Sequence, residues 1–307
     1  RRGPDQSSQP RAEPLGRGRS ARDLLPRAGA GARAIPAARP TTAGFNYYPA
    51  AIDNQLAKHI DLVGLNYKPT TYIELMEKYP DMIVYGAETS SCVSSRGVYH
   101  LPMEKYKTHE SLQVTSYDLI GPPWAYPPDI EFMEQDKYPN VLGEFIWTGF
   151  DYLGEPTPYY LARSSYCGII DLAGFPKDRY FLYKARWQPE QPLVHILPHW
   201  NWPDRVGEIT PVHIFTSGDE AELFLNGHSL GRKIRGEYEY RLRWDSVRYE
   251  PGKLRAVAYR RGELWAENTV HTTGAPAALF AEADRSLIRA DGRDLSFITV
   301  QILDAEK

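Results

Sequence analysis

The 307-residue sequence lacks the features that mark several classes of protein. No apolar run approaches the roughly 20 residues of a membrane-spanning helix, so we expect no membrane partner. Two cysteines, Cys92 and Cys167, make neither a disulfide framework nor a zinc site. The sequence also has no phosphate-binding loop, dinucleotide fingerprint or cluster of metal-ligating residues. We therefore predict neither a metal nor a cofactor.

The first forty residues lack lysine and aromatic side chains and differ in composition from the rest. Nine Arg and three acidic residues give them a net charge of +6, whereas residues 41–307 carry −9. Such a segment buries too little apolar surface to offset its ordering entropy, so we predict disorder for residues 1–40. A basic arm for nucleic acid is the alternative. No aromatic or folded basic element accompanies it, so we expect no nucleic-acid partner and prefer a non-native tail.

Short apolar strands alternate with short helices from residue 41 to about residue 190. The predicted strands are Thr41–Phe45, Leu62–Asn66, Met82–Ala87 and Val141–Trp147. Between them, Asp53 is expected to cap a helix that runs to about His59. The capping-box pattern Thr71–Glu74 opens a second helix, and Pro128 begins a third. This alternation predicts βα units and a parallel sheet over residues 41–190.

The pattern changes to period two after about residue 191, which predicts antiparallel strands. These strands are Leu193–Leu197, Val212–Thr216, Glu222–Leu225, Tyr238–Trp244, Lys253–Tyr259 and Glu263–Val270. Their spacing predicts an immunoglobulin-like β-sandwich over residues 191–274. Residues 275–307 begin another β pattern of about three strands, which we interpret as the truncated start of a further β-sandwich domain.

The residues at the ends of the predicted strands have the composition of a sugar site. Aromatic and acidic side chains stand among Gly and Pro after the last strand: Trp147, Asp151, Tyr152 and Glu155. An indole ring stacks on a sugar face, and carboxylates accept hydrogen bonds from its hydroxyls. Tyr67 and Glu88 also lie at strand ends, the rim that carries the chemistry of a (β/α) barrel. The alternative is a structural carboxylate at Glu88, paired with a loop residue such as Arg96.

Three segments together resemble glycoside hydrolase family 2, in particular its β-galactosidase-type members with accessory sandwich domains. These segments are Leu65–Tyr67, Tyr85–Ser91 and Gly143–Tyr152. The resemblance covers roughly residues 36–307. It implies the C-terminal half of a (β/α)₈ TIM barrel, with the four predicted strands as its fifth to eighth. It also implies a retaining hydrolase of β-galactosides. A β-glucuronidase and a non-catalytic carbohydrate-binding β-sandwich protein are the alternatives.

The same resemblance implies a role for individual residues. Glu88 matches the catalytic nucleophile, and Glu144 is the runner-up. Tyr67 matches the tyrosine that hydrogen-bonds the nucleophile, and Trp147 matches the floor of the sugar subsite. Asp151 and Glu144 match acidic positions of the eighth-strand motif. We expect Asp151 to contact substrate and Glu144 to lie behind the site.

Asn66 and Lys68 flank Tyr67 and are expected to belong to the same site. Asn66 is predicted to support the site from behind, and Lys68 to contact the substrate. A lysine there could bind the carboxylate of a uronic acid, which would indicate a glucuronide. The Asn-x-Lys signature expected for such a substrate after the eighth strand is absent, and Asn66-Tyr67-Lys68 has that form elsewhere. We therefore prefer a galactoside.

A retaining glycosidase also needs a general acid/base about 5–5.5 Å from its nucleophile. In the family this residue is the Glu of an Asn-Glu pair at the end of the fourth strand. The sequence contains no Asn-Glu dipeptide. We therefore expect the acid/base and strands one to four to be missing, and this fragment alone to have little or no turnover. Oligomeric state and compartment are left open, although members of this multi-domain type are often exported from bacterial cells.

Overall fold

The computed structural model of the chain describes residues 40–138 and 140–306. The tail predicted for residues 1–40 lies outside this range except for Pro40. Residues 41–307 form one compact unit. None of the described helices is long and apolar enough to cross a membrane.

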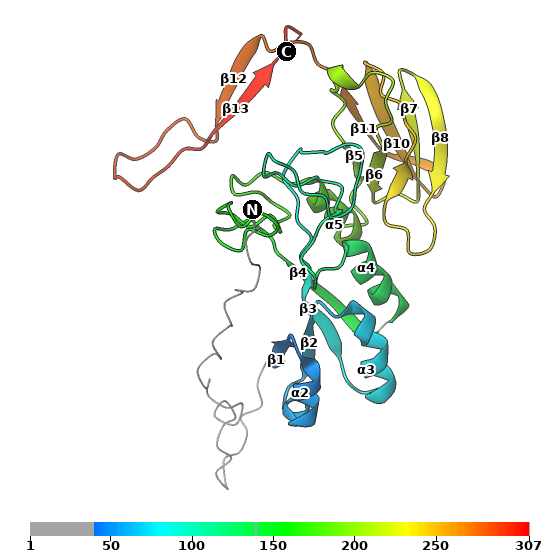
Figure 1. Cartoon of the computed structure of the whole chain (residues 1–307), viewed down its shortest axis with the longest axis vertical. Helices are drawn as coiled ribbons and strands as arrows, with labels where there is room; N and C mark the ends of the chain where they lie inside the picture. The colour runs from blue at the N-terminus through cyan, green and yellow to red at the C-terminus, as the bar shows by residue number, and fades with distance from the viewer. Residues whose placement is uncertain (1–39, 139, 307) are drawn as a thin grey trace, which may run out of the picture. The chain divides into compact units, whose positions relative to one another are not determined.

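A four-stranded parallel sheet forms the first part of this unit (Figure 1). Its strands are β1 (Thr42–Phe45), β2 (Leu62–Asn66), β3 (Val84–Ser90) and β4 (Val141–Trp147), in the order β1-β2-β3-β4. Four of the five β2 residues are buried, as expected for a parallel strand covered on both faces. Because all four strands are parallel, their C-terminal ends lie along one edge of the sheet, where the site is found.

Helices and short turns connect the strands. The helices are α2 (Tyr48–Asp53), α3 (Tyr72–Lys78), α4 (Pro128–Lys137) and α5 (Asp178–Trp187), and the 3₁₀ turns are η1 (Leu56–His59), η2 (Pro69–Thr71) and η3 (Pro203–Arg205). Tyr72 and Leu75 of α3 pack against Val63, Leu65 and Val84 to form the core under the sheet. This burial orders helices too short to be stable alone.

Three helix predictions need correction. Asp53 ends a helix instead of capping one, because Pro49 already supplies the first turn of α2. Thr71 makes no side-chain cap, because the 3₁₀ turn η2 leads directly into α3 and leaves Thr71 near helical dihedral angles. Helix α5 was not predicted at all, although Pro176 precedes it and Asp178 lies in its first turn.

Strand β3 begins and ends later than the predicted Met82–Ala87. Its last residues pair with β4, Thr89 with Ile146 and Ser90 with Trp147, and this pairing prolongs the strand. Glu88 consequently lies inside β3, near its C-terminal end, instead of just beyond it. Ser90 and Ser91 then have φ values of 63° and 61°, so the chain leaves the sheet in a left-handed conformation that is uncommon for residues other than glycine.

Two antiparallel sheets pack face to face in the second part of the unit, with the strand orders β11-β10-β7-β8 and β5-β6-β9. The strands are β5 (Val194–Leu197), β6 (Val212–Thr216), β7 (Glu220–Leu225), β8 (His228–Ile234), β9 (Leu242–Trp244), β10 (Lys253–Arg260) and β11 (Glu263–His271). Leu223 and Ala256 from one sheet meet Ile196 and Ile214 from the other in a shared core. We call this part, from β5 to β11, the sandwich.

Strand β8 was not predicted, because all of its residues are exposed and its sequence shows no alternation. The strand expected at Tyr238–Trp244 is shorter, since only β9 pairs with β6. The remainder of the described chain, instead of about three strands, holds the antiparallel pair β12 (Ala278–Ala283) and β13 (Ile298–Leu303). The predicted division of the chain into domains remains a prediction.

Candidate active site

A cavity of about 820 Å³ lies at the C-terminal edge of the parallel sheet. Tyr67 and Lys68 reach it just after β2, Glu88 near the end of β3, and Trp147 at the end of β4. Its other lining residues come from loops: Asn46, Ser91, Val93, Pro122, Trp124, Tyr152, Glu155, Pro156, Thr157, Tyr160 and Cys167. The structure thus brings together four of the five side chains predicted to contact substrate or react with it. Asp151 does not line the cavity.

Glu88 and Tyr67 contact each other through both side chains and backbone. The Tyr67 hydroxyl donates to Glu88 Oε2 over 2.9 Å, and the Tyr67 N–H donates to the Glu88 carbonyl over 2.8 Å. Burial and the bond to Glu88 raise the pKa of Tyr67, so its phenol stays protonated and acts as a donor. Asn66 lies beside Glu88 in the β2–β3 register and is buried. The Glu88 carboxylate is therefore held by the tyrosine that directly follows β2.

For the glycoside hydrolysis that the sequence resemblance implies, replacing Tyr67 with Phe is expected to lower kcat about 10- to 100-fold, the value of one hydrogen bond to a charged group. The ring keeps its packing, and the hydrogen bonds of the hydroxyl with Glu88 and Ser91 are lost. Steady-state kinetics on a nitrophenyl glycoside measure the change. Tyr159→Phe is the matched control, because its hydroxyl serves the His109 N–H and the Gln113 carbonyl instead. Equal losses in both variants would contradict the role given to Tyr67.

Trp147 is fixed by two polar residues that also line the cavity. Its Nε1–H donates to the Tyr152 hydroxyl over 3.2 Å, and the two rings meet edge to face with centroids 6.0 Å apart. The Tyr152 hydroxyl in turn donates to Glu155. These two hydrogen bonds fix the plane of the Trp147 indole at the end of β4. An indole in a fixed plane is suited to stacking on an apolar sugar face.

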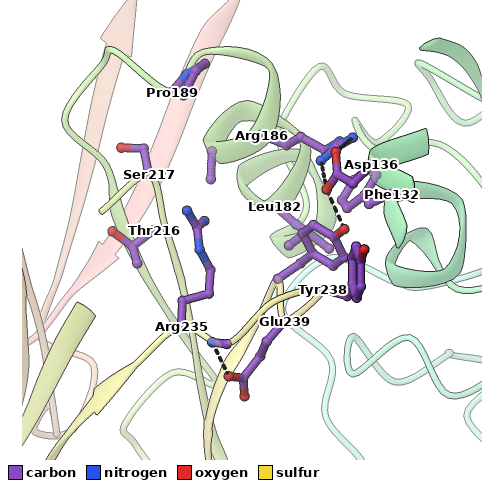
Figure 2. A pocket seen from close by; sticks show the side chains of 13 residues that line it. Phe132, Asp136, Leu182, Arg186, Pro189, Thr216, Ser217, Arg235, Tyr238 and Glu239 are labelled. Atoms are coloured by element: carbon purple, nitrogen blue, oxygen red, sulfur yellow. Dashed lines mark hydrogen bonds and ion pairs between the residues drawn. The ribbon is translucent and has the colours of Figure 1, made fainter. Parts of the chain in front are cut away.

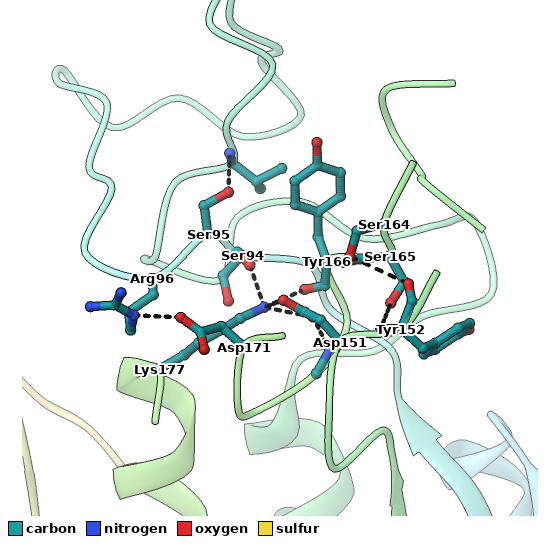
Figure 3. Close-up of polar contacts among 12 residues, drawn as sticks. Ser94, Ser95, Arg96, Asp151, Tyr152, Ser164, Ser165, Tyr166, Asp171 and Lys177 are labelled. Atoms are coloured by element: carbon teal, nitrogen blue, oxygen red, sulfur yellow. Dashed lines mark hydrogen bonds and ion pairs between the residues drawn. The ribbon is translucent and has the colours of Figure 1, made fainter. Parts of the chain in front are cut away.

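Asp151 forms an ion pair with the buried side chain of Lys177 (Figure 3). Lys177 Nζ lies 2.8 Å from Asp151 Oδ1 and 2.7 Å from its Oδ2, and the lysine side chain is only 1% exposed. The Gly168 N–H donates to the same carboxylate over 2.8 Å. Burial lowers the pKa of Lys177 to about 8, and the attraction of Asp151 opposes that shift. Asp151 therefore holds the loop after β4 instead of facing the cavity.

Glu144 does not line the cavity, and it lies near a second buried acid. Its Oε2 accepts from the Thr89 hydroxyl over 2.5 Å. Glu131 of α4 is fully buried and accepts from the Tyr72 hydroxyl over 3.3 Å. Burial raises the pKa of Glu144, and burial together with the charge of Glu144 raises that of Glu131 well above its ordinary 4.5. Glu144 faces away from the cavity lining, which makes it a poorer nucleophile candidate than Glu88.

These raised pKa values predict a stability that falls with pH. The folded state holds the protons of Glu131 and Glu144 more tightly than the unfolded chain does. Their contribution is complete below pH 4.5 and is lost as the pH rises through the raised values. We expect Glu131→Gln to become progressively more stable than the parent chain above pH 4.5. Urea unfolding at several pH values measures this difference, and a difference that does not change with pH would contradict it.

Lys68 lies at the cavity as a half-buried cation. Its Nζ is 3.4 Å from the Tyr67 carbonyl, and no ion pair joins it to any other residue of the described chain. Within residues 40–138 and 140–306, no group of three His, Cys, Asp or Glu side chains converges as metal ligands would. The charged groups that face the cavity are thus Lys68, Glu88 and Glu155.

Sequence reasoning missed the aromatic rim of the cavity and the basic residues behind it. Trp124 and Tyr160 come from separate loops and are 51% and 83% exposed. Neither loop has a regular pattern, so only the unusual aromatic content of these segments could have drawn attention to them. Lys177 and Arg179 at the start of α5 are almost fully buried. Because helix α5 is not predicted from the sequence, nothing marks these two residues as part of a site.

Comparisons with known proteins place the chain among glycoside hydrolases. It is 36% identical over 279 residues to a β-galactosidase of Bacteroides ovatus, which covers 87% of this chain and 32% of that protein. It is 37% identical over 175 residues to a putative β-glucuronidase of Formosa agariphila, covering 53% of this chain and 16% of that protein. The chain thus spans a third or less of the length of these curated relatives. Residues 207–266 match a model described as a domain of unknown function (DUF4982).

Solved structures share the same mixed α/β architecture with several sheets. A β-glycosidase from Bacteroides vulgatus matches with a TM-score of 0.71 and 25% identity, over 87% of this chain and 40% of that one. A glycosyl hydrolase family 2 member from Bacteroides cellulosilyticus matches with a TM-score of 0.67 and 27% identity, over 87% and 35% of the two chains. The match therefore includes both the parallel sheet and most of the β-strands that follow it.

Proposed function

The chain belongs to glycoside hydrolase family 2, and from this premise we propose that the whole protein is a retaining hydrolase of terminal β-galactosides. The observation that carries the proposal is the cavity in which Glu88, Tyr67 and Trp147 meet. The relative similar to 87% of this chain is named a β-galactosidase, which supports the choice of sugar.

The parallel sheet β1–β4 is proposed as strands five to eight of a (β/α)₈ barrel. Its parallel order and a cavity at its C-terminal edge support this, since barrel enzymes place their sites at that edge. The sandwich is proposed to be immunoglobulin-like, and the pair β12–β13 to begin a further sandwich. These assignments support the domain ranges 41–190, 191–274 and 275–307.

In the proposed reaction, Glu88 attacks the anomeric carbon and forms a glycosyl ester, while the bond to the leaving oxygen breaks. A general acid protonates that oxygen, and the same group then deprotonates the water that hydrolyses the ester. Tyr67 donates to the carboxylate, and Trp147 supports the sugar face. No residue of this chain is assigned as the acid/base, because no Asn-Glu pair occurs in it.

Turnover by the whole protein tests the proposal. It should release nitrophenol from nitrophenyl β-galactoside faster than from nitrophenyl β-glucuronide, and proton NMR should show the β-anomer of galactose as the first product. A first product of inverted configuration would contradict the retaining mechanism. Carbohydrate binding without hydrolysis of either substrate would favour the alternative of a non-catalytic binding protein.

A β-glucuronidase is the second candidate, and the ammonium of Lys68, which has no ion-pair partner among the described residues, favours it. A half-buried cation at the cavity is suited to a substrate carboxylate, which would supply its missing partner. Several relatives named β-glucuronidases are consistent with this. The same pair of nitrophenyl substrates distinguishes the two sugars. Faster glucuronide hydrolysis that falls in Lys68→Met would replace the galactoside assignment.

Replacing Trp124 with Ala is expected to lower kcat/KM for a disaccharide by about two- to tenfold and to leave hydrolysis of galactosyl fluoride unchanged. Exposed rim aromatics stack on the sugar that leaves, and such a contact contributes about 0.5–1.5 kcal/mol. Initial rates on both substrates measure the effect. Trp187→Ala is the matched control, because Trp187 is 48% exposed but lies on α5 outside the cavity. Equal losses on both substrates would contradict a contact with the leaving group.

A further inference from the structure

A chain of buried charges connects the sandwich to the loop that follows the proposed nucleophile. Arg241 lies just before β9. Its Nη1 is 3.0 Å from Asp118 Oδ2, and its Nη2 is 2.6 Å from Asp129 Oδ2. The opposite oxygen of Asp118 lies 3.2 Å from Nε of Arg179. The side chains of Arg241, Asp118 and Arg179 are 9%, 2% and 0% exposed. Asp118 therefore joins an arginine of the sandwich to an arginine of α5.

Arg179 holds the loop at the cavity directly. One of its NH groups donates to the Cys92 carbonyl, and the other donates to the Ser94 hydroxyl over 2.8 Å. The neighbouring residues Ser91 and Val93 line the cavity. Arg179 thus holds the Cys92 carbonyl and the Ser94 hydroxyl, while Ser91 and Val93 of the same loop border the cavity.

The backbone that joins this loop to Glu88 has a conformation that needs support. Ser90 and Ser91 both have positive φ, and neither is a residue type that adopts this region readily. Such conformations persist where the surrounding contacts over-determine them. Arg179 supplies two of these contacts, at Cys92 and Ser94, beside the hydrogen bond that the Tyr126 N–H donates to the Ser90 carbonyl over 3.1 Å.

The end of the sandwich that carries Arg241 is itself anchored to α4 and α5. Asp136 of α4 accepts two hydrogen bonds from Arg186 of α5 and one of 2.6 Å from the Tyr240 hydroxyl, as Figure 2 shows in part. Arg241 Nε also donates to both oxygens of Asp129, over 2.9 and 2.8 Å. The bonds of Arg241 to Asp129 and of Tyr240 to Asp136 therefore fix the position of the Arg241 guanidinium group next to Asp118.

We propose that Arg241 is a positioning residue for the glycosidase site, acting through Asp118 and Arg179 on the loop that sets the orientation of Glu88. The sandwich then contributes a residue that positions the catalytic site, although that residue makes no contact with the substrate. This inference rests on the proposed function. It assigns Arg241 no contact with substrate, and its effect is on the rate at which Glu88 reacts.

The experiment uses the whole protein and a 2-fluoro glycosyl fluoride, which traps the nucleophile as a stable ester. Mass spectrometry gives the fraction labelled at completion and the rate of labelling. The variants are Arg241→Lys, which keeps the charge but loses the planar fork, and Arg241→Ala with added guanidinium ion below denaturing concentrations. Arg260→Met is the matched control, since Arg260 of the sandwich pairs at 2.8 Å with Glu190, an exposed residue away from the cavity.

We expect both Arg241 variants to label completely but at least tenfold more slowly, because a displacement of about 1 Å costs up to about 100-fold. Guanidinium should restore the Arg241→Ala rate, and Arg260→Met should stay within twofold of the parent. A defect in folding alone would lower the labelled fraction and leave the rate of that fraction unchanged, which would overturn the proposal. An equal loss in Arg260→Met would also overturn it.

Hydrogen exchange of residues 91–95 adds a readout that requires no activity. Faster exchange there in Arg241→Lys, with unchanged exchange in the sandwich core, supports the positioning role. Unchanged exchange in the loop contradicts it, even if the variant is less stable. Absence of labelling in the parent protein would refute the proposed glycosidase function, and the exchange result would still decide whether Arg241 holds the loop.

Discussion

Glu88→Gln is expected to lower kcat of the whole protein by about 10⁴- to 10⁶-fold, the loss typical of removing a nucleophile. The amide has nearly the same shape and can still accept the hydrogen bond that Tyr67 donates over 2.9 Å. It is too weak a nucleophile to form the glycosyl ester. The fold should be unaffected, because the side chain faces a cavity and not a core. Steady-state kinetics on a nitrophenyl glycoside measure the loss.

Glu155→Gln and Glu144→Gln are the matched controls for this substitution. Glu155 lines the same cavity but is bonded to Tyr152, so its variant should retain activity within about tenfold, the range for one surface hydrogen bond. Glu144 lies under the sheet against Thr89, and its variant should change stability more than kcat. Activity of Glu88→Gln within tenfold of the parent would remove Glu88 from the nucleophile role.

Lys177→Met is expected to lower the free energy of unfolding by about 3–5 kcal/mol, because it leaves the Asp151 carboxylate buried without a counter-charge. The methionine also removes donors to the Ser94 carbonyl at 2.7 Å and the Tyr166 carbonyl at 3.2 Å. All three partners are chain neighbours of residues that line the cavity. Urea unfolding measures the loss, and kcat/KM should fall with it because the cavity wall loosens.

The double variant Lys177→Met with Asp151→Leu is the control for the charge effect. Exchanging both partners of a buried ion pair for apolar groups is often close to neutral, so this variant should recover much of the lost stability. Its catalytic activity should remain low, since the Ser94 carbonyl still lacks its donor. A double variant as unstable as Lys177→Met would show that the pair contributes by packing and not by its charges.

The candidate site could be predicted to the extent that it lies at strand ends. Tyr67, Glu88 and Trp147 follow or end apolar strands, and parallel strands bring such positions to one edge of a sheet. The assignment of Glu88 as nucleophile came from the family resemblance and stays a prediction. Asp151 shows the limit of this reasoning. It lies in the loop after β4, as a substrate-binding carboxylate would, but it pairs with the buried Lys177 and does not line the cavity.

The elements that escaped prediction lack the local pattern on which prediction depends. Strand β8 is exposed along its whole length, so no alternation marks it. Arg179 and Arg241 are 62 positions apart, and each is further still from Cys92. Only the tertiary fold brings their buried charges together. The strand β3 extends past its apolar residues because pairing with β4, and not side-chain composition, sets its end.

Trapping the whole protein with a 2-fluoro galactosyl fluoride and sequencing the labelled peptide tests the central claim most directly. We expect a single ester on Glu88, within the peptide that also carries the loop from Ser91 to Ser94. A label on Glu144, on Glu155 or on any other side chain would contradict the account of the site.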